Sequence, residues 1–399
     1  MKDFFKISLI SIVLLFVGSN SPIFDKTTVL ASDEVPVKDI EQFVDIFKRI
    51  KEQYVDEVDD DELFKNAIQG MVNGLDPHSD FLSEDDFNEL KIGTTGRFGG
   101  LGIEITQEDR YIKVISPIDD TPAMRAGILA GDMIIKVDEN DLKDMPINDA
   151  VKLMRGEPGT SVEVTILRKK ENKPIILTIQ REIIISKGIK TKLFKSNIGY
   201  IRLSNFQSNS TSDLQTAFYK LNKESNNKLQ GLVVDLRNNP GGVLGAAVGI
   251  SDLFLQNGKI VETKGRSSNS ELKYEATARD ISNGMSLVVL INEGSASASE
   301  IVAGALQDNK RATILGTKSY GKASVQTIQE LSDGSALKLT TAKYYTPLGK
   351  DIHENGIIPD IVVELSEDDV VSLPEPYDKD RQLFEAIKIL SEKKVTAIN

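Results

Sequence analysis

The chain of 399 residues contains no cysteine and no tryptophan, and it has two histidines, His78 and His353. Without cysteine there can be no disulfide, thiolate zinc site, iron–sulfur cluster or cysteine nucleophile. Two histidines cannot form a three-histidine zinc site, and a Ser-His-Asp triad would have to use one of them. Both lie in turn-like or loop-like sequence. We expect no triad that uses either of them, and no metal or cofactor.

Basic residues are outnumbered: 48 Lys and Arg stand against 60 Asp and Glu, which gives a formal net charge of −12. Binding to nucleic-acid phosphates needs clustered basic side chains, and this sequence has no such block. We therefore expect no nucleic-acid partner. Hydrophobic residues make up 40% of the sequence, enough for packed cores, and the length predicts two or three domains.

The amino terminus has the features of an export signal. Lys2 and Lys6 precede an apolar run over Ile7–Gly18. This run is short for a membrane span of about 20 residues but fits the apolar region of a signal peptide, with small residues for cleavage after Ala31. We interpret residues 1–31 as a signal peptide or, if uncleaved, a membrane anchor. In either case we expect an exported, extracytoplasmic protein that is secreted or held at the outer face of the cytoplasmic membrane.

The patterns after residue 31 predict four further regions. Residues 33–92 form a helical region, because apolar residues recur there at spacings of three and four. Residues 93–182 alternate in short strand-like runs and predict a small β-rich domain. Residues 183–365 predict an α/β core, in which the strand candidates 231–236 and 286–291 contain continuous apolar runs that suit parallel strands buried on both faces. Farther along, Asp333-Gly334 links two strand-like runs, which predicts a hairpin. Residues 366–399 form a tail that ends in an amphipathic helix.

A cluster of small residues follows the second of these apolar runs. Asn292–Glu300 contains Ser295, Ser297 and Ser299 and leads into a predicted helix. The start of a helix presents free N–H groups to whatever binds there, so a serine at such a junction can be a nucleophile. The alternative is structural, because Ser297-x-x-Glu300 is also the sequence of a helix capping box.

Two other segments could complete an active site. Asp235–Gly242 ends the neighbouring predicted strand with a glycine pair, whose N–H groups could stabilise an oxyanion, although an ordinary turn would have the same sequence. Lys318 and Lys322 lie farther along in a glycine-containing segment. A surface lysine is the usual case, but a lysine that burial keeps neutral can act as a base.

Three segments in combination are similar to the carboxyl-terminal processing proteases, also called tail-specific proteases. They are Asp235–Gly242, Gly294–Leu306 and Gly321–Gln326. These proteases are multidomain α/β proteins with a crotonase-like serine peptidase core and an attached PDZ domain, and the resemblance covers nearly the whole chain after residue 33.

The resemblance implies a role for each matching residue. Ser297, the middle serine of Ser-Ala-Ser-Ala-Ser, would be the nucleophile, and Lys322, 25 residues later, the general base. Gln326 would orient that lysine. The oxyanion hole would combine the N–H of Ala298 with that of Gly241 or Gly242, and the sequence leaves both glycines open.

The glycine-rich segment at the start of the small domain resembles the carboxylate-binding loop of a PDZ domain. Gly100, Leu101, Gly102 and Ile103 would hold the free carboxyl terminus of a substrate through their main chain. Arg155 matches a family arginine proposed to link peptide binding to the active site, which makes it a candidate regulatory residue; the alternative is a solvated arginine at a helix end.

The sequence therefore predicts an exported serine endopeptidase that selects proteins or peptides by their free carboxyl terminus and is regulated by its PDZ domain. One alternative is a non-catalytic PDZ scaffold or chaperone with a vestigial peptidase core. Another, an acyl-CoA enzyme on a similar core, would leave the PDZ domain unexplained. Apolar stripes lie at Ile40–Tyr54 and on the terminal helix, with Leu383, Ile387 and Leu390. The family resemblance implies that such terminal helices join subunits, so we expect a homodimer; the alternative is that the stripes pack within the chain.

Overall fold

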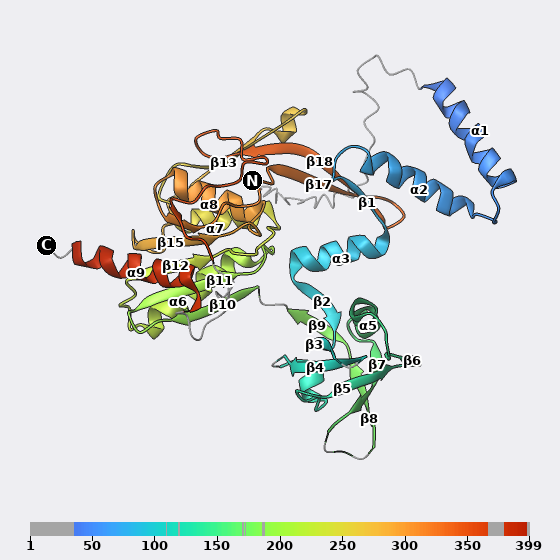
Figure 1. Cartoon of the computed structure of the whole chain (residues 1–399), viewed down its shortest axis with the longest axis horizontal. Coiled ribbons are helices and arrows are strands. Elements are labelled where there is room, and N and C mark those ends of the chain that lie inside the picture. Colours follow the sequence, from blue (N-terminus) through green and yellow to red (C-terminus); the bar gives the residue numbers. More distant parts are fainter. Residues whose placement is uncertain are drawn as a thin grey trace, which may run out of the picture. The chain divides into compact units, whose positions relative to one another are not determined.

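A computed structural model describes residues 36–108, 110–118, 120–169, 171, 173–185, 188–365 and 379–396 (Figure 1). The predicted leader, residues 1–31, lies outside this set, as do residues 366–378 and 397–399 of the predicted tail. The chain divides into two units, one up to Ile68 and one from Gln69 onward. Among the described residues no helix has the length and apolar composition that crossing a bilayer requires.

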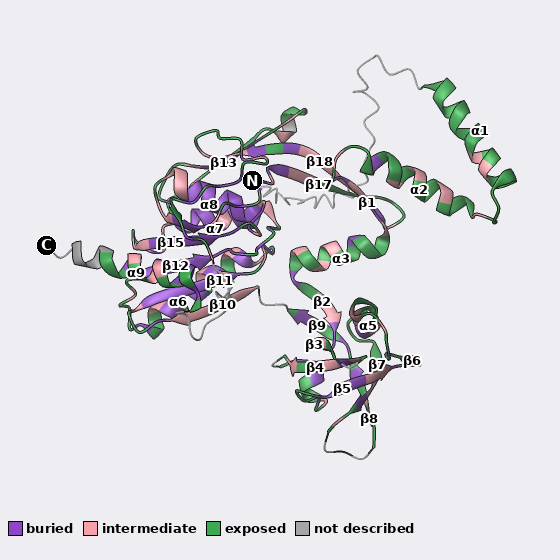
Figure 2. Ribbon diagram, in the orientation of Figure 1, coloured by how far each residue is buried: buried purple, intermediate pink, exposed green. Residues whose placement is uncertain are grey.

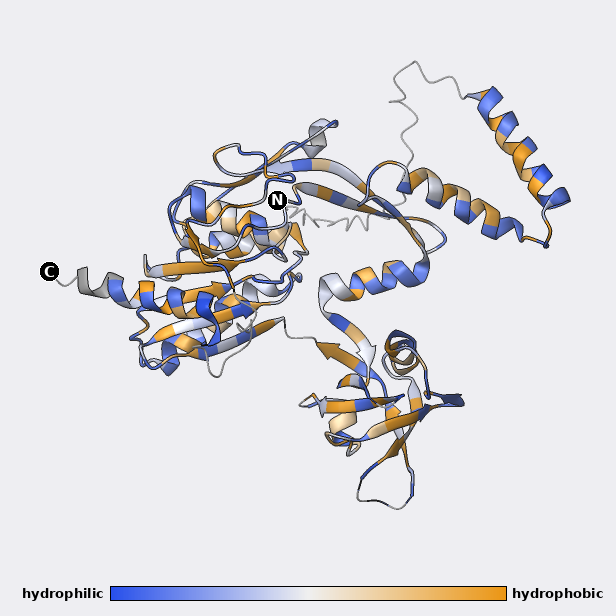
Figure 3. Cartoon of the chain, in the orientation of Figure 1, coloured by the Kyte–Doolittle hydropathy of each residue, from blue (hydrophilic) through white to orange (hydrophobic). Residues whose placement is uncertain are grey.

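The first unit contains the predicted amino-terminal helices. α1 spans Val37–Gln53, and α2, Asp60–Asn73, begins in this unit. Phe47 stacks on Phe64 with 4.9 Å between ring centroids, which holds the two helices together. α1 has no buried residue, and apolar and polar residues alternate around it in Figure 3.

In the second unit, the end of α2 is followed by an element that the helical pattern did not predict. β1, Asp80–Leu82, pairs antiparallel with β18, Ala336–Tyr345. The preceding turn and the helix start at Ser83 leave too few residues for a helix, whereas a short strand can add to the edge of a sheet. α3, Glu84–Thr95, follows, and the Ser83 hydroxyl caps it by accepting from the Asp86 N–H at 3.2 Å.

A small β-domain occupies the region predicted from residue 93 to 182. Its sheet has the order β3-β4-β5-β7-β8, and the short β6 pairs with β5. The strands are β3 (Ile103–Glu108), β4 (Tyr111–Pro117), β5 (Met133–Val137), β6 (Asn140–Asp141), β7 (Ser161–Leu167) and β8 (Ile175–Gln180). Two helices, α4 (Pro122–Arg125) and α5 (Ile147–Met154), accompany them. β2 (Arg97–Gly100) and β9 (Glu182–Ile185) pair antiparallel at its ends.

The α/β core is built on a six-stranded sheet of order β10-β11-β12-β15-β16-β19. Its strands are β10 (Ile189–Leu193), β11 (Ile198–Leu203), β12 (Gly231–Asp235), β15 (Ser286–Ile291), β16 (Thr313–Gly316) and β19 (Ile361–Val362). All neighbours from β11 to β19 are parallel, and β10 is antiparallel to β11. The prediction of parallel strands buried on both faces is confirmed, since every residue of β12 is buried (Figure 2).

Helices cover both faces of this sheet. Leu232 and Val234 point to one face, where they join a core with α6 (Ser210–Glu224), α7 (Leu244–Asp252) and α8 (Ala298–Asp308). Val233 points to the other face, toward α9 (Arg381–Thr396). The alternation follows from the two-residue period of a strand.

The terminal helix corrects one expectation. Leu383 and Leu390 of α9 are buried against β12 and β15, and Ile387 packs against the same cluster. The apolar stripe that was expected to bind a second subunit is therefore used within the chain. The described part of the predicted tail belongs to the core, which leaves α1 as the candidate dimer surface.

A second sheet packs beside the α/β core. It has the order β1-β18-β13-β14, and β17 (Ser324–Glu330) pairs with β18. β13 spans Lys259–Gly265 and β14 spans Leu272–Glu275, with a single 3₁₀ turn, Ser268–Ser270, between them. The hairpin predicted at Asp333-Gly334 is confirmed, and Gly334 adopts a φ of 84°, which suits glycine.

Candidate active site

Three loops meet at the carboxyl ends of adjacent parallel strands, the usual place for a site in an α/β sheet. They follow β12, β15 and β16, and they contain the segments singled out from the sequence. The Asn239 carbonyl accepts from the Ala296 N–H at 3.0 Å and from the Ser299 hydroxyl at 2.9 Å. The Tyr320 N–H donates to the Ser295 carbonyl at 3.0 Å, which joins the third loop to the second.

Ser297 occupies the N-cap position of α8 with a left-handed backbone, φ 55° and ψ −114°. A residue other than glycine in such a region costs of order 1–3 kcal/mol, and such residues cluster at functional sites. Ser297 is half-buried, whereas Ser295 and Ser299 are fully buried. The Ser295 hydroxyl donates to the Leu236 carbonyl at 2.8 Å, so it stabilises the loop.

The capping box predicted at this helix is present, and it does more than cap. The Glu300 carboxylate accepts from the Ser297 N–H at 2.8 Å. It also accepts from the N–H of Gly321 at 2.7 Å and of Lys322 at 2.9 Å, and from the Ser319 hydroxyl at 2.6 Å. One buried side chain thus joins the segment of the candidate nucleophile to that of the candidate base.

Tyr344 reinforces this junction from β18. Its hydroxyl donates to the main-chain carbonyls of Ser297, at 3.1 Å, and of Lys322. Burial raises the pKa of Tyr344 well above its usual value, and the adjacent Glu300 charge adds to the effect, so the phenol stays a donor. Neither this tyrosine nor the wider role of Glu300 was found from the sequence, because both depend on contacts between distant segments.

The glycine pair lies directly beside Ser297. A Cβ on Gly241 would come within 2.8 Å of the Ser297 Cβ and 3.0 Å of the Ala298 nitrogen, so the close approach requires glycine. The Gly241 N–H donates to Asn239 Oδ1 at 2.9 Å. In the described part of the chain, the N–H groups of Gly242 and Ala298 have no acceptor.

Lys322 is half-buried and has an altered pKa. Burial lowers the pKa of Lys322 below its usual 10.5, and the charge of Lys338 lowers it further. Asp76 and Glu300 act in the opposite direction. The lower pKa increases the fraction of neutral amine, which is the form that a base requires.

Gln326 lies on β17, and its amide nitrogen donates to Ser324 Oγ at 2.9 Å and to Thr340 Oγ1 at 3.2 Å. Among the described residues the structure has no hydrogen bond between Gln326 and Lys322. Gln326 as the residue that orients the lysine therefore stays a prediction.

The histidines lie closer to this site than the sequence suggested. Burial lowers the pKa of His78, and the charges of Lys322, Lys338 and His353 act on it as well, while Asp76 opposes them. His353 lies in a turn, and its N–H donates to Asp351 at 2.9 Å. No hydrogen bond joins either histidine to Ser297 among the residues that the structure describes.

A groove at the start of the small domain contains the predicted carboxylate-binding residues. Gly100, Leu101, Gly102 and Ile103 line a cavity of about 140 Å³ with apolar side chains from β3 and α5. Gly102 has a φ of 78°, and a Cβ there would overlap Thr121. In the described residues the N–H groups of Leu101 and Gly102 have no acceptor, as a site for an anion requires.

Arg155 forms one edge of that groove, at the end of α5. Its Nη1 donates to both carboxylate oxygens of Glu89 on α3 at 2.6 Å, and its guanidinium lies 4.8 Å from the centroid of the Phe98 ring. Its Nε is buried and has no partner. The structure thus places Arg155 beside this groove, bound to Glu89 rather than to Gln326 or Lys322.

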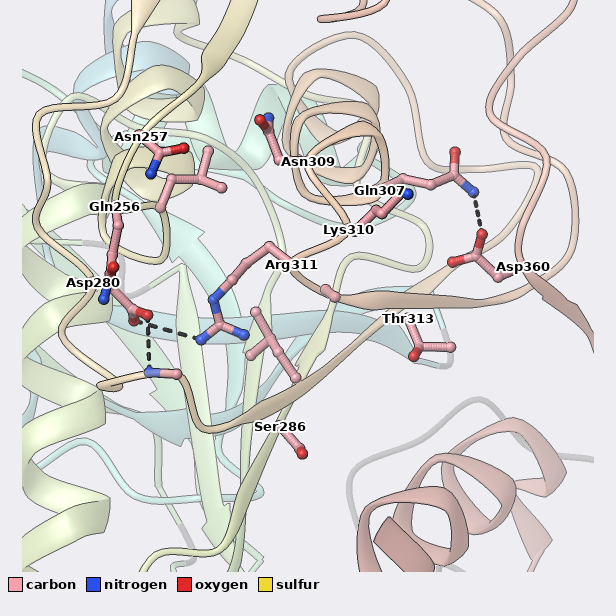
Figure 4. A pocket seen from close by; sticks show the side chains of 14 residues that line it. Gln256, Asn257, Asp280, Ser286, Gln307, Asn309, Lys310, Arg311, Thr313 and Asp360 are labelled. Atoms are coloured by element: carbon pink, nitrogen blue, oxygen red, sulfur yellow. Dashed lines mark hydrogen bonds and ion pairs between the residues drawn. The ribbon is translucent and has the colours of Figure 1, made fainter. Parts of the chain in front are cut away.

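A cavity of about 650 Å³ lies at the amino ends of β15 and β16, the opposite end from Ser297 (Figure 4). Polar side chains of this cavity already have hydrogen-bond partners: Arg311 donates to the main-chain carbonyls of Phe254 and Met285 at 2.7 and 2.9 Å, and Gln307 donates to Asp360 at 2.9 Å. No group of three His, Asp or Glu side chains in the described residues is placed to hold a metal ion.

The fold and the site have the features of a PDZ-containing serine protease, and comparisons with known proteins agree. Residues 197–363 match Peptidase family S41, and residues 99–179 match the PDZ domain. Residues 19–86 match the N-terminal domain of the activating protease CtpB. The predicted peptidase core and PDZ domain are confirmed.

Individual relatives lead to the same family. A carboxy-terminal-processing protease of Bartonella bacilliformis is 46% identical over 364 residues, which are 91% of this chain and 82% of the relative. A probable CtpA-like serine protease of Staphylococcus haemolyticus is 34% identical, over 98% of this chain and 78% of that protein. A solved S41 protease structure from Bacteroides fragilis, 18% identical, shares the fold with a TM-score of 0.51 over 84% of this chain and 90% of its own. This chain belongs to the carboxy-terminal-processing protease family.

Proposed function

We propose that this chain is an exported serine endopeptidase that binds the free carboxyl terminus of a protein substrate at Gly100–Ile103 and cleaves the substrate with a Ser297–Lys322 dyad. The observation that carries the proposal is that both residues are tied to the buried Glu300 carboxylate. Two further observations support it: Ser297 has a positive φ at the start of α8, and the pKa of Lys322 is lowered.

The chemistry follows from the positions of these groups. The Ser297 oxygen attacks the scissile carbonyl carbon while neutral Lys322 takes the hydroxyl proton. The oxyanion accepts from the Ala298 N–H and from one glycine N–H, each worth roughly 3 kcal/mol. Among the described residues the Gly242 N–H has no acceptor, whereas Gly241 would first have to release Asn239. Lys322 then gives its proton to the leaving amine, and water hydrolyses the acyl-enzyme.

Regulation through the PDZ domain is part of the proposal. A carboxylate at Leu101–Gly102 would lie near the unpartnered Nε of Arg155, and its charge would compete with Glu89 for the guanidinium. Release of Arg155 from Glu89 would report that a substrate is bound.

Assembly and export complete the proposal. α1 exposes Val37, Ile40 and Phe43, an apolar surface that a second copy of the chain could cover. Light scattering on a form that begins near residue 32 should give a dimer, and Phe43→Glu should reduce its mass by half. Fractionation of the producing cells tests whether the full chain leaves the cytoplasm, as the features of residues 1–31 suggest.

Cleavage of an unfolded reporter protein tests the dyad. Ser297→Ala and Lys322→Ala should each abolish cleavage and leave thermal unfolding nearly unchanged. Lys318→Ala is the matched control, because Lys318 is exposed and contacts one carbonyl, that of Glu354, at 3.3 Å. Ser295→Ala should lower stability but retain cleavage. Activity in Ser297→Ala, or its loss in Lys318→Ala alone, would contradict the assignment.

A further inference from the structure

A turn from the amino-terminal region, residues 76–79, binds the edge of the second sheet next to the candidate base. The Asp76 carboxylate accepts from the N–H groups of His78 and Ser79 at 2.8 and 2.9 Å and from the Ser79 hydroxyl at 2.7 Å. The Ser79 oxygen accepts in turn from the Thr340 N–H of β18 at 3.1 Å. The pairing of Asp80 with Lys338 then continues the contact along the strand.

The Thr340 side chain connects this turn to Gln326. The Thr340 hydroxyl donates to Asp76 Oδ1 at 3.1 Å and accepts from Gln326 Nε2 at 3.2 Å. Burial alone would raise the pKa of Asp76, but hydrogen bonds from Ser79, His78 and Thr340 lower it overall, so the carboxylate is ionised at neutral pH.

This chain of donors fixes which end of the Gln326 amide points where. An ionised carboxylate can only accept, so the Thr340 proton is committed to Asp76 and Thr340 can only accept from Gln326. The Gln326 nitrogen must therefore face Thr340 and Ser324. Its carbonyl oxygen has no partner among the described residues and remains available as an acceptor.

Lys322 belongs to the same neighbourhood. It precedes Gln326 by four residues, and the Asp76 charge acts on it across β18. The other groups that act on the Lys322 ammonium are Lys338 and Glu300, and His78 of the same turn interacts with it electrostatically. The lysine, the glutamine and the turn thus meet at one place.

We propose that Asp76 and Thr340 are positioning residues for the general base, which hold the Gln326 carbonyl toward Lys322. A neutral amine has two N–H groups and one lone pair. When one N–H is donated to the Gln326 oxygen, the lone pair can point to the Ser297 hydroxyl and take its proton. This inference rests on the proposed dyad and adds to it a contribution from the amino-terminal segment.

The first experiment removes only the hydroxyl of Thr340, in the full chain. Thr340→Val should lower kcat about tenfold to a hundredfold with little change in KM, because general-base catalysis contributes roughly 10²–10⁴-fold and the base is still present. Thr340→Ser, which keeps the hydroxyl, should restore most of the rate. Thr341→Val is the matched control, since Thr341 bonds to Thr327 on the same strand pair at 2.6 Å, in an exposed contact.

A double-mutant cycle shows whether Thr340 acts through Gln326. Gln326→Ala should lower kcat, and adding Thr340→Val should then lower it no further, because the amide that Thr340 orients is gone. Multiplicative effects of the two changes would overturn the proposal, and so would equal losses in Thr340→Val and Thr340→Ser. A loss of stability caused by Thr340→Val would lower kcat both with and without Gln326→Ala, so it would not produce the expected result.

The Asp76 charge gives a separate readout. Asp76→Asn removes a negative charge that raises the pKa of Lys322, so the acidic limb of kcat/KM against pH should move to lower pH and kcat should fall. Asp333→Asn is the control, because the exposed Asp333 accepts from the N–H and the hydroxyl of Ser335 in the same way. If Asp76→Asn leaves both the acidic limb and kcat unchanged while Lys322→Ala is inactive, this inference is wrong. An active Lys322→Ala would instead refute the proposed dyad.

Discussion

The main-chain N–H groups of Ser297 and Lys322 donate to the same oxygen, Oε2 of Glu300, at 2.8 and 2.9 Å. Glu300 is 1% exposed, so water does not compete for these bonds. The candidate nucleophile and base come from different loops, and a third residue holds them at a fixed separation. Glu300 can therefore be mutated while the side chains of Ser297 and Lys322 are both retained.

Glu300→Gln should therefore be nearly inactive although Ser297 and Lys322 remain. The amide nitrogen would face at least one N–H or hydroxyl donor, and each unpaired buried donor costs about 1–3 kcal/mol. We expect kcat to fall at least tenfold and the thermal unfolding temperature to drop. Glu293→Gln is the matched control, because Glu293 lies in the same loop but is exposed and accepts from Thr317 at 3.1 Å. Full activity in Glu300→Gln would show that the junction is not needed.

The lowered pKa of Lys322 predicts how activity depends on pH. A base must be neutral, so kcat/KM should rise with pH through the pKa of Lys322, which burial and Lys338 place below 10.5. Lys338→Gln removes a positive neighbour, raises the pKa of Lys322 and should move this acidic limb to higher pH. Lys343→Gln, an exposed lysine on the same strand, should leave the limb in place. An acidic limb that stays in place in Lys338→Gln would argue against Lys322 as the titrating base.

The contact between Glu89 and Arg155 predicts a change in regulation. If Glu89 retains Arg155 when no peptide is bound, Glu89→Gln weakens that contact and should raise the basal cleavage of substrates whose carboxyl terminus is amidated. Cleavage of free-carboxyl substrates should change less. Kinetics on the two substrate forms, with Glu157→Gln as a control on the adjacent loop, would measure the ratio. An unchanged ratio would leave Glu89 as a surface ion pair of little consequence.

The sequence predicted best what depends on local patterns. The strand candidates 231–236 and 286–291 form parallel neighbours in the sheet, and the hairpin at Asp333-Gly334 formed where its turn residues lie. The serine and glycine segments could be brought together because adjacent parallel strands end at the same edge of a sheet. These inferences need only the period of a strand and the conformational freedom of glycine.

The sequence did not predict contacts between segments that are distant along the chain. Asp80–Leu82 is too short to be distinguished from a loop until β18 offers an edge. From the sequence, Glu300 is interpreted only as a helix cap, because its other hydrogen-bond donors lie far along the chain at residues 319–322. An amphipathic stripe such as that of α9 does not state whether its own chain or a second subunit will cover it.

The anchor of α9 supports a last prediction, about stability. Arg237 is fully buried between two carboxylates: it donates to Asp235 Oδ2 at 2.7 Å and to the two oxygens of Asp380 at 2.8 and 2.7 Å. Burial alone would lower the pKa of Arg237, but Asp235 and Asp380 reverse this and keep the guanidinium charged. Asp380 directly precedes α9, so this ion pair fastens the helix to the end of β12.

Asp380→Asn should destabilise the protein by about 3 kcal/mol, the lower end of the range for a broken buried pair, because Asp235 still faces the guanidinium. Denaturant unfolding would measure this loss, and amide exchange should increase first in α9. Asp144→Asn, which breaks the exposed pair with Arg110, should have no measurable effect. The loop that leads to Gly241 begins near Arg237. We therefore expect kcat also to fall in Asp380→Asn under conditions where the protein remains folded. Wild-type stability in Asp380→Asn would mean that the packing of Leu383 and Leu390 and the hydrogen bonds of Gln382 hold the helix without this ion pair.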